Sequence, residues 1–409
     1  MSKSKYLILG GGVAAGYAAR EFVKLGLKPG ELSIVSAEDQ PPYDRPPLSK
    51  DVLKGEAAAG DAVIEGRQFY EEHGIELRLG TEIDRVDFGK RRLGSGDEEF
   101  EFEKLLIATG ARAKRFDLPG ADRDGIFYLH TSRHLEHIVE AAEGADRVVV
   151  IGGSFIGTEV SASLTERGLH ATLVFPEKRI MENKPLTWEM SAFFEHYFRK
   201  RGVEVLAGQK VKAFRGDGAV AAVVLDRDRE LETRFVVAGI GVIPNTELFG
   251  GTPLKIDDGI IVDEYLQTGV PDVYAVGDVA RYTDKLLGGS RRIEHWANAK
   301  RQAEHVARSM MGDRQPYEEL PYFFSDVFDL SWEYWGDRTQ ADRVVYRGDV
   351  DSGSFSAWWL RGRRVVAAFV MDRPGDEREA AQTLITSRRE IDPSRLTDES
   401  RSVIDADGE

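Results

Sequence analysis

Two glycine-rich segments carry the residues whose types and spacing point most directly to chemistry. The segments are Gly10-x-Gly12-x-x-Ala15 and Gly152-x-Ser154-x-x-Gly157. Small residues at these positions permit a tight turn, bring the backbone close to a pyrophosphate and let the following helix pack on its strand. The N–H groups and positive dipole end at the start of that helix attract phosphate oxygens. Each segment therefore predicts a dinucleotide site.

An acidic residue lies downstream of each loop, after the next apolar strand. Glu38 is placed to accept hydrogen bonds from a ribose, and Glu177 could bind an adenosine ribose and repel a 2′-phosphate, which favours NADH over NADPH. Lys178 and Arg179 are adjacent cations that could soften this preference. NADPH therefore stays an alternative, as does a Glu177 that is merely a solvated charge.

Both loops lie in the strand–turn–helix–strand context that the motif requires. The expected first strands are 6–9 and 148–151, and the expected second strands are 32–35 and 171–175. A further strand and small-residue turn follow in each copy, at 105–110 and 236–241. The chain thus holds two copies of one nucleotide-binding βαβ architecture. The loops and turns yield these candidate cofactor-binding residues: Gly10, Gly12, Val13, Ala14, Ala15, Thr109, Gly110, Gly152, Ser154, Phe155, Ile156, Gly157 and Gly241.

Two dinucleotide sites in one chain imply two dinucleotides. We expect FAD in one and a nicotinamide coenzyme in the other, so that hydride passes from nicotinamide to flavin while the protein supplies orientation. The predicted fold is α/β, with two Rossmann-like dinucleotide-binding domains, the second inserted in the first, and a C-terminal α+β domain. The expected boundaries are 1–115 with 245–321 for the FAD domain, 116–244 for the NAD(P)H domain and 322–409 for the C-terminal interface domain.

From about residue 322, short runs of alternating apolar and polar residues predict short strands. Its aromatic residues could form a lid over a cofactor or the core of a small domain, and core is the favoured interpretation; they are Trp332, Tyr334, Trp335, Trp358 and Trp359. The tail beyond Asp392 is polar and is expected to be loose.

Composition excludes several classes of protein. A formal charge of −15 over 409 residues disfavours nucleic acid and anionic lipid as partners. The absence of cysteine excludes disulfide frameworks, thiolate metal sites and cysteine nucleophiles. No apolar run is long enough to span a bilayer, and we expect a cytoplasmic protein. His130, His134 and His137 have helical spacing, but we expect no metal there.

The sequence resembles a known flavoprotein superfamily related to glutathione reductase. Segments 10–22, 42–50 and 328–332 look like monodehydroascorbate reductase. Segments 153–157 and 175–178 look like apoptosis-inducing factor, and segment 324–326 is nearer the ferredoxin reductases of oxygenase systems. The resemblance covers nearly the whole chain. It implies FAD in the first site, NAD(P)H in the second and a C-terminal domain beside the flavin.

The resemblance also assigns site residues. FAD contacts are implied for Glu38, Arg45, Lys50, Arg133, Gly277 and Asp278, while Glu294 and His295 are implied on the nicotinamide side, Trp296 near the flavin and Phe324 on the substrate side. Lys50 and Glu159 are the implied reactive centre, a pair beside the flavin ring. A lysine there would stabilise the anion formed on reduction, and the glutamate would hold the lysine in place. A buried structural ion pair is the alternative, and the two roles are compatible.

Without cysteines, electrons cannot leave through a dithiol beside the flavin. They must pass directly to an external acceptor, a small molecule or a docked redox protein. The predicted function is therefore that of a FAD-dependent NAD(P)H oxidoreductase similar to monodehydroascorbate reductase. The sequence is compatible with an oligomer. Lys300, Phe324 and Asp326 replace an arginine, a tyrosine and an arginine of that family. Two alternatives stay open: a ferredoxin or rubredoxin reductase, and a slow-turnover NADH sensor resembling apoptosis-inducing factor.

Overall fold

The computed structural model describes residues 2–182 and 185–403. The chain divides into two compact units, which are described separately below. Unit 1 comprises Met1–Arg45, Gly60–Arg112 and Val242–Glu319; unit 2 comprises Pro46–Ala59, Ala113–Gly241 and Leu320–Glu409. Among the described residues, no helix is both long enough and apolar enough to cross a membrane.

Unit 1 is built on a sheet in which β1 is the central strand. The sheet has the order β3-β2-β1-β6-β5-β4, and β18 also pairs with β6. Its strands are β1 (Ser2–Leu9), β2 (Leu32–Val35), β3 (Glu76–Arg78), β4 (Arg85–Asp87), β5 (Arg92–Ser95), β6 (Glu98–Ile107) and β18 (Val273–Ala275). All four residues of β2 and the last four of β1 are buried, as expected for parallel strands covered on both faces.

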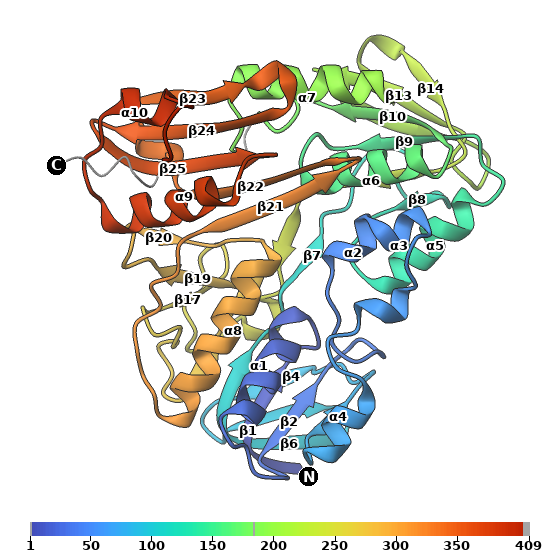
Figure 1. Cartoon of the computed structure of the whole chain (residues 1–409). Helices are drawn as coiled ribbons and strands as arrows, with labels where there is room; N and C mark the ends of the chain where they lie inside the picture. Colours follow the sequence, from blue (N-terminus) through green and yellow to red (C-terminus); the bar gives the residue numbers. More distant parts are fainter. Residues whose placement is uncertain (1, 183–184, 404–409) are drawn as a thin grey trace. The chain divides into compact units, whose positions relative to one another are not determined.

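Helices α1 (Val13–Lys24) and α8 (Trp296–Met311) pack against each other in unit 1, as Figure 1 shows. Ala14, Ala15 and Ala18 of α1 are buried. The unit also contains α4 (Arg67–Glu72) and a small sheet of β17 (Ile260–Val262), β19 (Ala280–Thr283) and β20 (Ser290–Arg291).

The inserted part of unit 2 repeats this architecture. Its sheet has the order β11-β10-β9-β15-β8, so that β10-β9-β15 matches β2-β1-β6 of unit 1. The strands are β8 (Ile126–Phe127), β9 (Arg147–Ile151), β10 (His170–Phe175), β11 (Glu204–Ala207) and β15 (Val236–Ala238), and the helices are α5 (Ser132–Ala142), α6 (Phe155–Glu166) and α7 (Trp188–Lys200). A separate antiparallel sheet contains β12 (Val211–Arg215), β13 (Ala222–Leu225) and β14 (Glu230–Glu232). The expected internal repeat is therefore present.

The chain leaves unit 1 and returns to it on two paired strands, β7 (Ala111–Ala113) and β16 (Val242–Pro244). The segment Pro46–Ala59, which we had expected within 1–115, belongs to unit 2. It forms α2 (Pro46–Ser49) and α3 (Asp51–Lys54), both packed on α6. Carbonyls at the ends of these short helices accept hydrogen bonds from α6 and its C-cap: Ser163 Oγ donates to Ser49 O at 2.7 Å and Arg167 donates to Leu53 O at 2.9 Å.

The C-terminal part of unit 2 is a five-stranded antiparallel sheet of order β21-β22-β25-β24-β23. Its strands are β21 (Tyr322–Val327), β22 (Leu330–Gly336), β23 (Arg343–Asp349), β24 (Ser354–Arg361) and β25 (Arg364–Met371), and α9 (Gly375–Ser387) packs on β25. The five aromatic residues singled out in the sequence are all buried. They form the core of this part and are not a lid.

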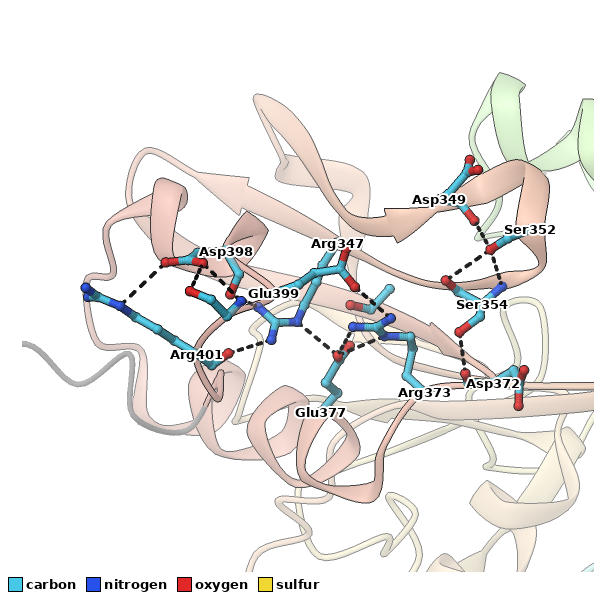
Figure 2. Close-up of polar contacts among 12 residues, drawn as sticks. Arg347, Asp349, Ser352, Ser354, Asp372, Arg373, Glu377, Asp398, Glu399 and Arg401 are labelled. Atoms are coloured by element: carbon cyan, nitrogen blue, oxygen red, sulfur yellow. Dashed lines mark hydrogen bonds and ion pairs between the residues drawn. The ribbon is translucent and has the colours of Figure 1, made fainter.

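Residues 393–403 of the tail are packed against the protein, contrary to the expectation of a loose tail. They include α10 (Pro393–Thr397), and the side chains of Leu396 and Val403 are buried. Figure 2 shows how Arg347, only 5% exposed, donates to Glu377 Oε1 at 3.0 Å and to main-chain oxygens of Asp398 and Arg401. A buried arginine thus ties the polar tail to β23, which composition alone does not reveal.

Candidate active site

The two glycine loops adopt the same turn at the same place in their sheets. Gly10 follows β1 with φ +126°, and a Cβ added there would lie 2.2 Å from the carbonyl oxygen of Ala108. Gly152 follows β9 with φ +123°, and its Cβ would lie 2.2 Å from the carbonyl oxygen of Gly239. Any side chain at either position would force the strands apart. The loops therefore need glycine for backbone reasons, as the motif predicts.

The helices that follow these loops begin without a side-chain cap. Gly12 is the N-cap of α1 and Ser154 is the N-cap of α6, and neither makes a side-chain capping hydrogen bond. Serine is a favoured capping residue, yet Ser154 does not cap its helix. By contrast, Thr131 and Thr187 cap α5 and α7. An uncapped helix start offers its first N–H groups to an anion. The residues present thus fit one pyrophosphate group at each loop.

Two groups of hydrogen-bonded polar residues follow the strands β2 and β6 of unit 1. Glu38 accepts hydrogen bonds from Tyr43 Oη at 2.5 Å and Arg45 at 3.2 Å, which hold its carboxylate in place after β2. Thr109 and Gly110 follow β6, and Thr109 exchanges two hydrogen bonds with Asn245. Asn245 was not identified from the sequence.

Asp278 lies in the short turn Gly277–Val279 that follows β18, the strand that pairs with β6. Burial raises the pKa of its carboxyl to about 6, a rise that Glu294 reinforces and that Arg45 and Arg292 oppose. The N–H of Gly277 donates to Gln302 Oε1 at 2.8 Å, so the turn itself is fixed by α8.

The first residues of α8 also contribute to unit 1. His295 caps the helix, because its Nδ1 accepts the N–H of Ala297 at 3.2 Å. Trp296 donates from Nε1 to Asp44 at 2.5 Å, and Asp44 also accepts from Tyr17. Lys300 Nζ lies 4.7 Å from the ring centroid of Tyr17 and 5.2 Å from that of Trp296. Burial and the charge of Asp44 raise the pKa of Tyr17 to about 12.

Lys50 and Glu159 meet in unit 2, as the resemblance implies. Lys50 Nζ lies 2.9 Å from Glu159 Oε1, and the two side chains are only 12% and 6% exposed. Ser325 donates to the same oxygen at 2.6 Å, and Ser49 donates to Glu159 Oε2 at 2.6 Å. The carboxylate therefore has a partner on each oxygen, and three elements supply the cluster: α2 with its following residue, α6 and β21.

The two serines are functional candidates that the residue analysis did not identify. Ser49 adjoins Lys50 in the segment 42–50, and Ser325 lies inside 324–326, so the resemblance already contained both. Phe324, next to Ser325, places its ring centroid 5.8 Å from Lys50 Nζ. A buried carboxylate with this many donors can hold a lysine ammonium in one position.

The remaining predicted residues of unit 2 lie around the second loop. Phe155 stacks on Phe323 of β21 at 6.2 Å between ring centroids, while Ile156 is exposed. A Cβ on Gly157 would lie 1.7 Å from the carbonyl oxygen of Gly152, so this glycine lets α6 approach the turn. Glu177 follows β10, and its carbonyl accepts the N–H of Gly208 at 2.7 Å.

Two further predictions concern the edges of this domain. Gly241 ends the inserted segment, and its carbonyl accepts the N–H of Lys114 at 2.9 Å. Arg133 lies in the first turn of α5, beside His134, whose Nδ1 accepts the N–H of the N-cap Thr131 at 3.3 Å. Within the described part of the chain, no three potential metal ligands are grouped.

Comparison with protein families identifies the two parts of the chain. Residues 4–303 match the family described as Pyridine nucleotide-disulphide oxidoreductase, and residues 322–406 match Reductase C-terminal. The second match begins where the antiparallel sheet begins, at β21. The chain itself contains no cysteine, so it cannot form the disulphide of the family's name.

Individual relatives agree with this result. The chain is 39% identical over 403 residues to "Monodehydroascorbate reductase" of Solanum lycopersicum, covering 92% of each protein. It is 38% identical over 429 residues to the protein of that name in Pisum sativum, covering 97% of this chain and 98% of the relative.

Solved structures agree as well. The fold matches the reductase structure described as "covalent putidaredoxin reductase-putidaredoxin complex" with TM-score 0.93 and 30% identity, covering 99% of this chain and 98% of the other. It matches the ferredoxin reductase of the CYP199A2 system from Rhodopseudomonas palustris with the same TM-score and identity over the full length of both. The predicted resemblance and fold class are confirmed. The chain belongs to the pyridine nucleotide-disulphide oxidoreductase family and is a FAD-dependent NAD(P)H oxidoreductase that passes electrons to an external acceptor.

Proposed function

We propose that the chain oxidises NADH and reduces a small anionic one-electron acceptor of the monodehydroascorbate type. The observation that carries this proposal is the buried Lys50–Glu159 pair in a chain without cysteine. A fixed ammonium can stabilise negative charge on a reduced flavin, and no thiol relay exists to carry electrons elsewhere. The relatives named monodehydroascorbate reductase, which span nearly the whole chain, support the choice of acceptor.

Each glycine loop is assigned to a different coenzyme. We assign FAD to 1–115 with 245–321, NAD(P)H to 116–244 and the acceptor-side interface to 322–409. The uncapped starts of α1 and α6 bind the phosphates, and Glu38 and Glu177 bind the riboses. Bound FAD supplies the chemistry that accepts a hydride and releases electrons one at a time.

Residues of this chain keep the reactive region in one arrangement. Glu159 fixes Lys50, and Ser49 and Ser325 fix Glu159, so the ammonium does not have to reorganise during reduction. Within unit 1, Lys300 lies on the aromatic faces of Tyr17 and Trp296 and supplies a positive charge that suits an anionic acceptor.

The test begins with the spectrum of the purified protein. Oxidised flavin bands should be present, and anaerobic NADH should bleach them. Steady-state NADH oxidation is then measured with ascorbate radical, neutral quinones, ferricyanide and a ferredoxin. Turnover that is fastest with ascorbate radical supports the proposal, whereas a protein that neither contains nor takes up FAD contradicts it.

A second candidate acceptor is an iron–sulfur protein. Two structural matches at 30% identity support it: a reductase described in complex with putidaredoxin and the ferredoxin reductase of the CYP199A2 system. In that case cytochrome c reduction requires the added iron–sulfur protein and depends steeply on salt. Slow turnover with every acceptor, together with a long-lived reduced complex, would instead indicate an NADH sensor.

We further propose a cytoplasmic location. The relatives are described both as cytosolic, in Oryza sativa subsp. japonica, and as peroxisomal, in Arabidopsis thaliana. Cell fractionation of the native source tests this, and recovery of the protein in an organelle fraction contradicts it.

A further inference from the structure

A cation two residues after Glu177 raises the question of coenzyme choice. Discrimination between NADH and NADPH depends on the charge near the adenosine ribose: a carboxylate repels the 2′-phosphate, and an available arginine attracts it. Glu177 and Arg179 place both charges on one short segment after β10. The inference below rests on the proposed role of Glu177 at that ribose.

The Arg179 guanidinium is already engaged within the protein. Its Nη1 lies 3.0 Å from Glu195 Oε2, and its central carbon lies 4.1 Å from the ring centroid of Trp188. Its Nε is buried and so is not presented to solvent. Trp188, the first residue of α7, is 54% exposed and forms an outer wall against which the guanidinium stacks.

Glu195 is fixed more firmly than a surface partner would be. Its side chain is only 2% exposed, its Oε1 accepts the N–H of Ile180 at 3.2 Å, and its Oε2 also lies 3.3 Å from Arg199. Ser191 donates to the carbonyl of Ile180 at 2.7 Å. Helix α7 therefore holds both the main chain after Arg179 and the guanidinium itself.

We propose that Glu195, with Trp188, withholds Arg179 from the coenzyme and so makes the site selective for NADH. The buried Glu195 carboxylate, which Arg199 shares, offsets the charge of Arg179 and holds it in place, so that Glu177 is the charge presented to the ribose. Lys178 is the remaining cation of the segment; its side chain is exposed, and its N–H donates to Glu182 at 2.6 Å. Glu195 is a positioning residue in this account, because it acts through Arg179.

The experiment compares two nucleotide probes on the purified holoenzyme by calorimetry. The probes are 5′-AMP and 2′,5′-ADP, which differ in the 2′-phosphate alone. In the Glu195→Gln variant the amide oxygen can still accept the Ile180 N–H, but the charge that holds Arg179 is gone. Affinity for 2′,5′-ADP should rise about tenfold while affinity for 5′-AMP stays within about twofold.

A second substitution shows whether Arg179 is responsible. The double variant Glu195→Gln with Arg179→Ala should lose the gain, whereas Glu195→Gln with Lys178→Ala should keep most of it. Glu204→Gln is the control, since it removes the carboxylate on β11 that pairs with Arg229, the residue just before β14. That control should leave the ratio of the two affinities unchanged.

Several outcomes would overturn the inference. Equal changes for both probes in Glu195→Gln would show a purely structural role for the clamp. A large loss of 2′,5′-ADP affinity in the single variant Arg179→Ala would show that the arginine already serves the coenzyme. Failure of 5′-AMP to bind the unaltered protein would instead refute the proposed coenzyme site, and this inference with it. The ratio of kcat/KM for NADPH and NADH should follow the binding data.

Discussion

The Glu159 carboxylate illustrates how single residues determine the properties of the proposed site. It is buried, carries one lysine and two serine hydroxyls, and lies on a helix whose start is left uncapped. An isolated carboxylate at such a position would be strongly unfavourable, so each donor matters.

We predict graded effects from removing these partners. Glu159→Gln should slow anaerobic flavin bleaching by NADH about tenfold or more, because Lys50 loses its counter-charge. Ser325→Ala should have a smaller effect, about fivefold, and should lower the free energy of unfolding by about 1–2 kcal/mol. Stopped-flow absorbance and urea unfolding measure the two quantities.

A nearby serine provides the matched control for this prediction. Ser331 lies on β22, opposite Asp326 of β21, and is exposed. Ser331→Ala should leave both the bleaching rate and the stability unchanged. If Ser325→Ala behaves like Ser331→Ala, the hydrogen bond to Glu159 has no role in positioning the pair.

Asp278 leads to a prediction about pH. Because burial raises its pKa in the folded flavin-free protein to about 6, the folded state favours the protonated carboxyl. This contribution to stability is present below the unfolded value of about 3.8 and is lost as pH rises through about 6. Asp278→Asn should therefore stabilise the flavin-free protein above pH 6, by on the order of 2 kcal/mol, and have little effect near pH 4.

Urea unfolding at pH 4 and pH 7.5 measures this difference. Asp258→Asn is the comparison variant, because Asp258 pairs with Arg292 at 2.9 Å yet is exposed. It should show no stabilisation at the higher pH. Equal stability of Asp278→Asn and the unaltered protein at pH 7.5 would show that the carboxyl is not destabilised by burial.

At the scale of elements, sequence patterns predicted the strands, glycine turns and acidic residues whose positions depend on the local backbone. The strands before Gly10 and Gly152, and the acids after β2 and β10, follow from spacing and residue type alone. The membership of Pro46–Ala59 in unit 2 could not be predicted, because it depends on hydrogen bonds from Ser163 and Arg167, far away in sequence. The roles of Ser49 and Ser325 could not be predicted either, because their partner Glu159 is far away in sequence.

The ordered tail escaped prediction because its anchor is a side chain on another strand. Residues 393–403 are mostly polar, but Arg347 satisfies two of their carbonyls from within the core (Figure 2). Local composition cannot reveal a hydrogen-bond partner that lies more than fifty residues earlier in the chain.

We predict that Arg347→Ala releases this tail. The change removes one partner of the buried Glu377 and leaves the carbonyls of Asp398 and Arg401 unpaired, so stability should fall by about 3 kcal/mol. Hydrogen–deuterium exchange should accelerate over 393–403. Arg364→Ala is the control, because Arg364 is largely exposed and lies 4.0 Å from Glu390. Unchanged exchange in Arg347→Ala would contradict an anchoring role.

For the whole molecule, net charge should shape encounters with acceptors. A formal charge of −15 repels multivalent anions, and salt screens such repulsion. We predict that kcat/KM for ferricyanide rises severalfold between about 0.01 M and about 0.15 M salt, while the value for a neutral quinone hardly changes. A decrease with salt would show that local positive charge, such as that of Lys300, outweighs the net charge.

The exit and return of the chain through β7 and β16 has a practical meaning for protein engineering. Because these two short strands are neighbours in one ladder, the polypeptide between them has its ends side by side. Such a segment can be exchanged between homologous reductases as a cassette with two adjacent splice points. Under the proposed assignment of NAD(P)H to 116–244, grafting this segment would transfer the coenzyme site through two junctions and leave the first nucleotide loop unchanged.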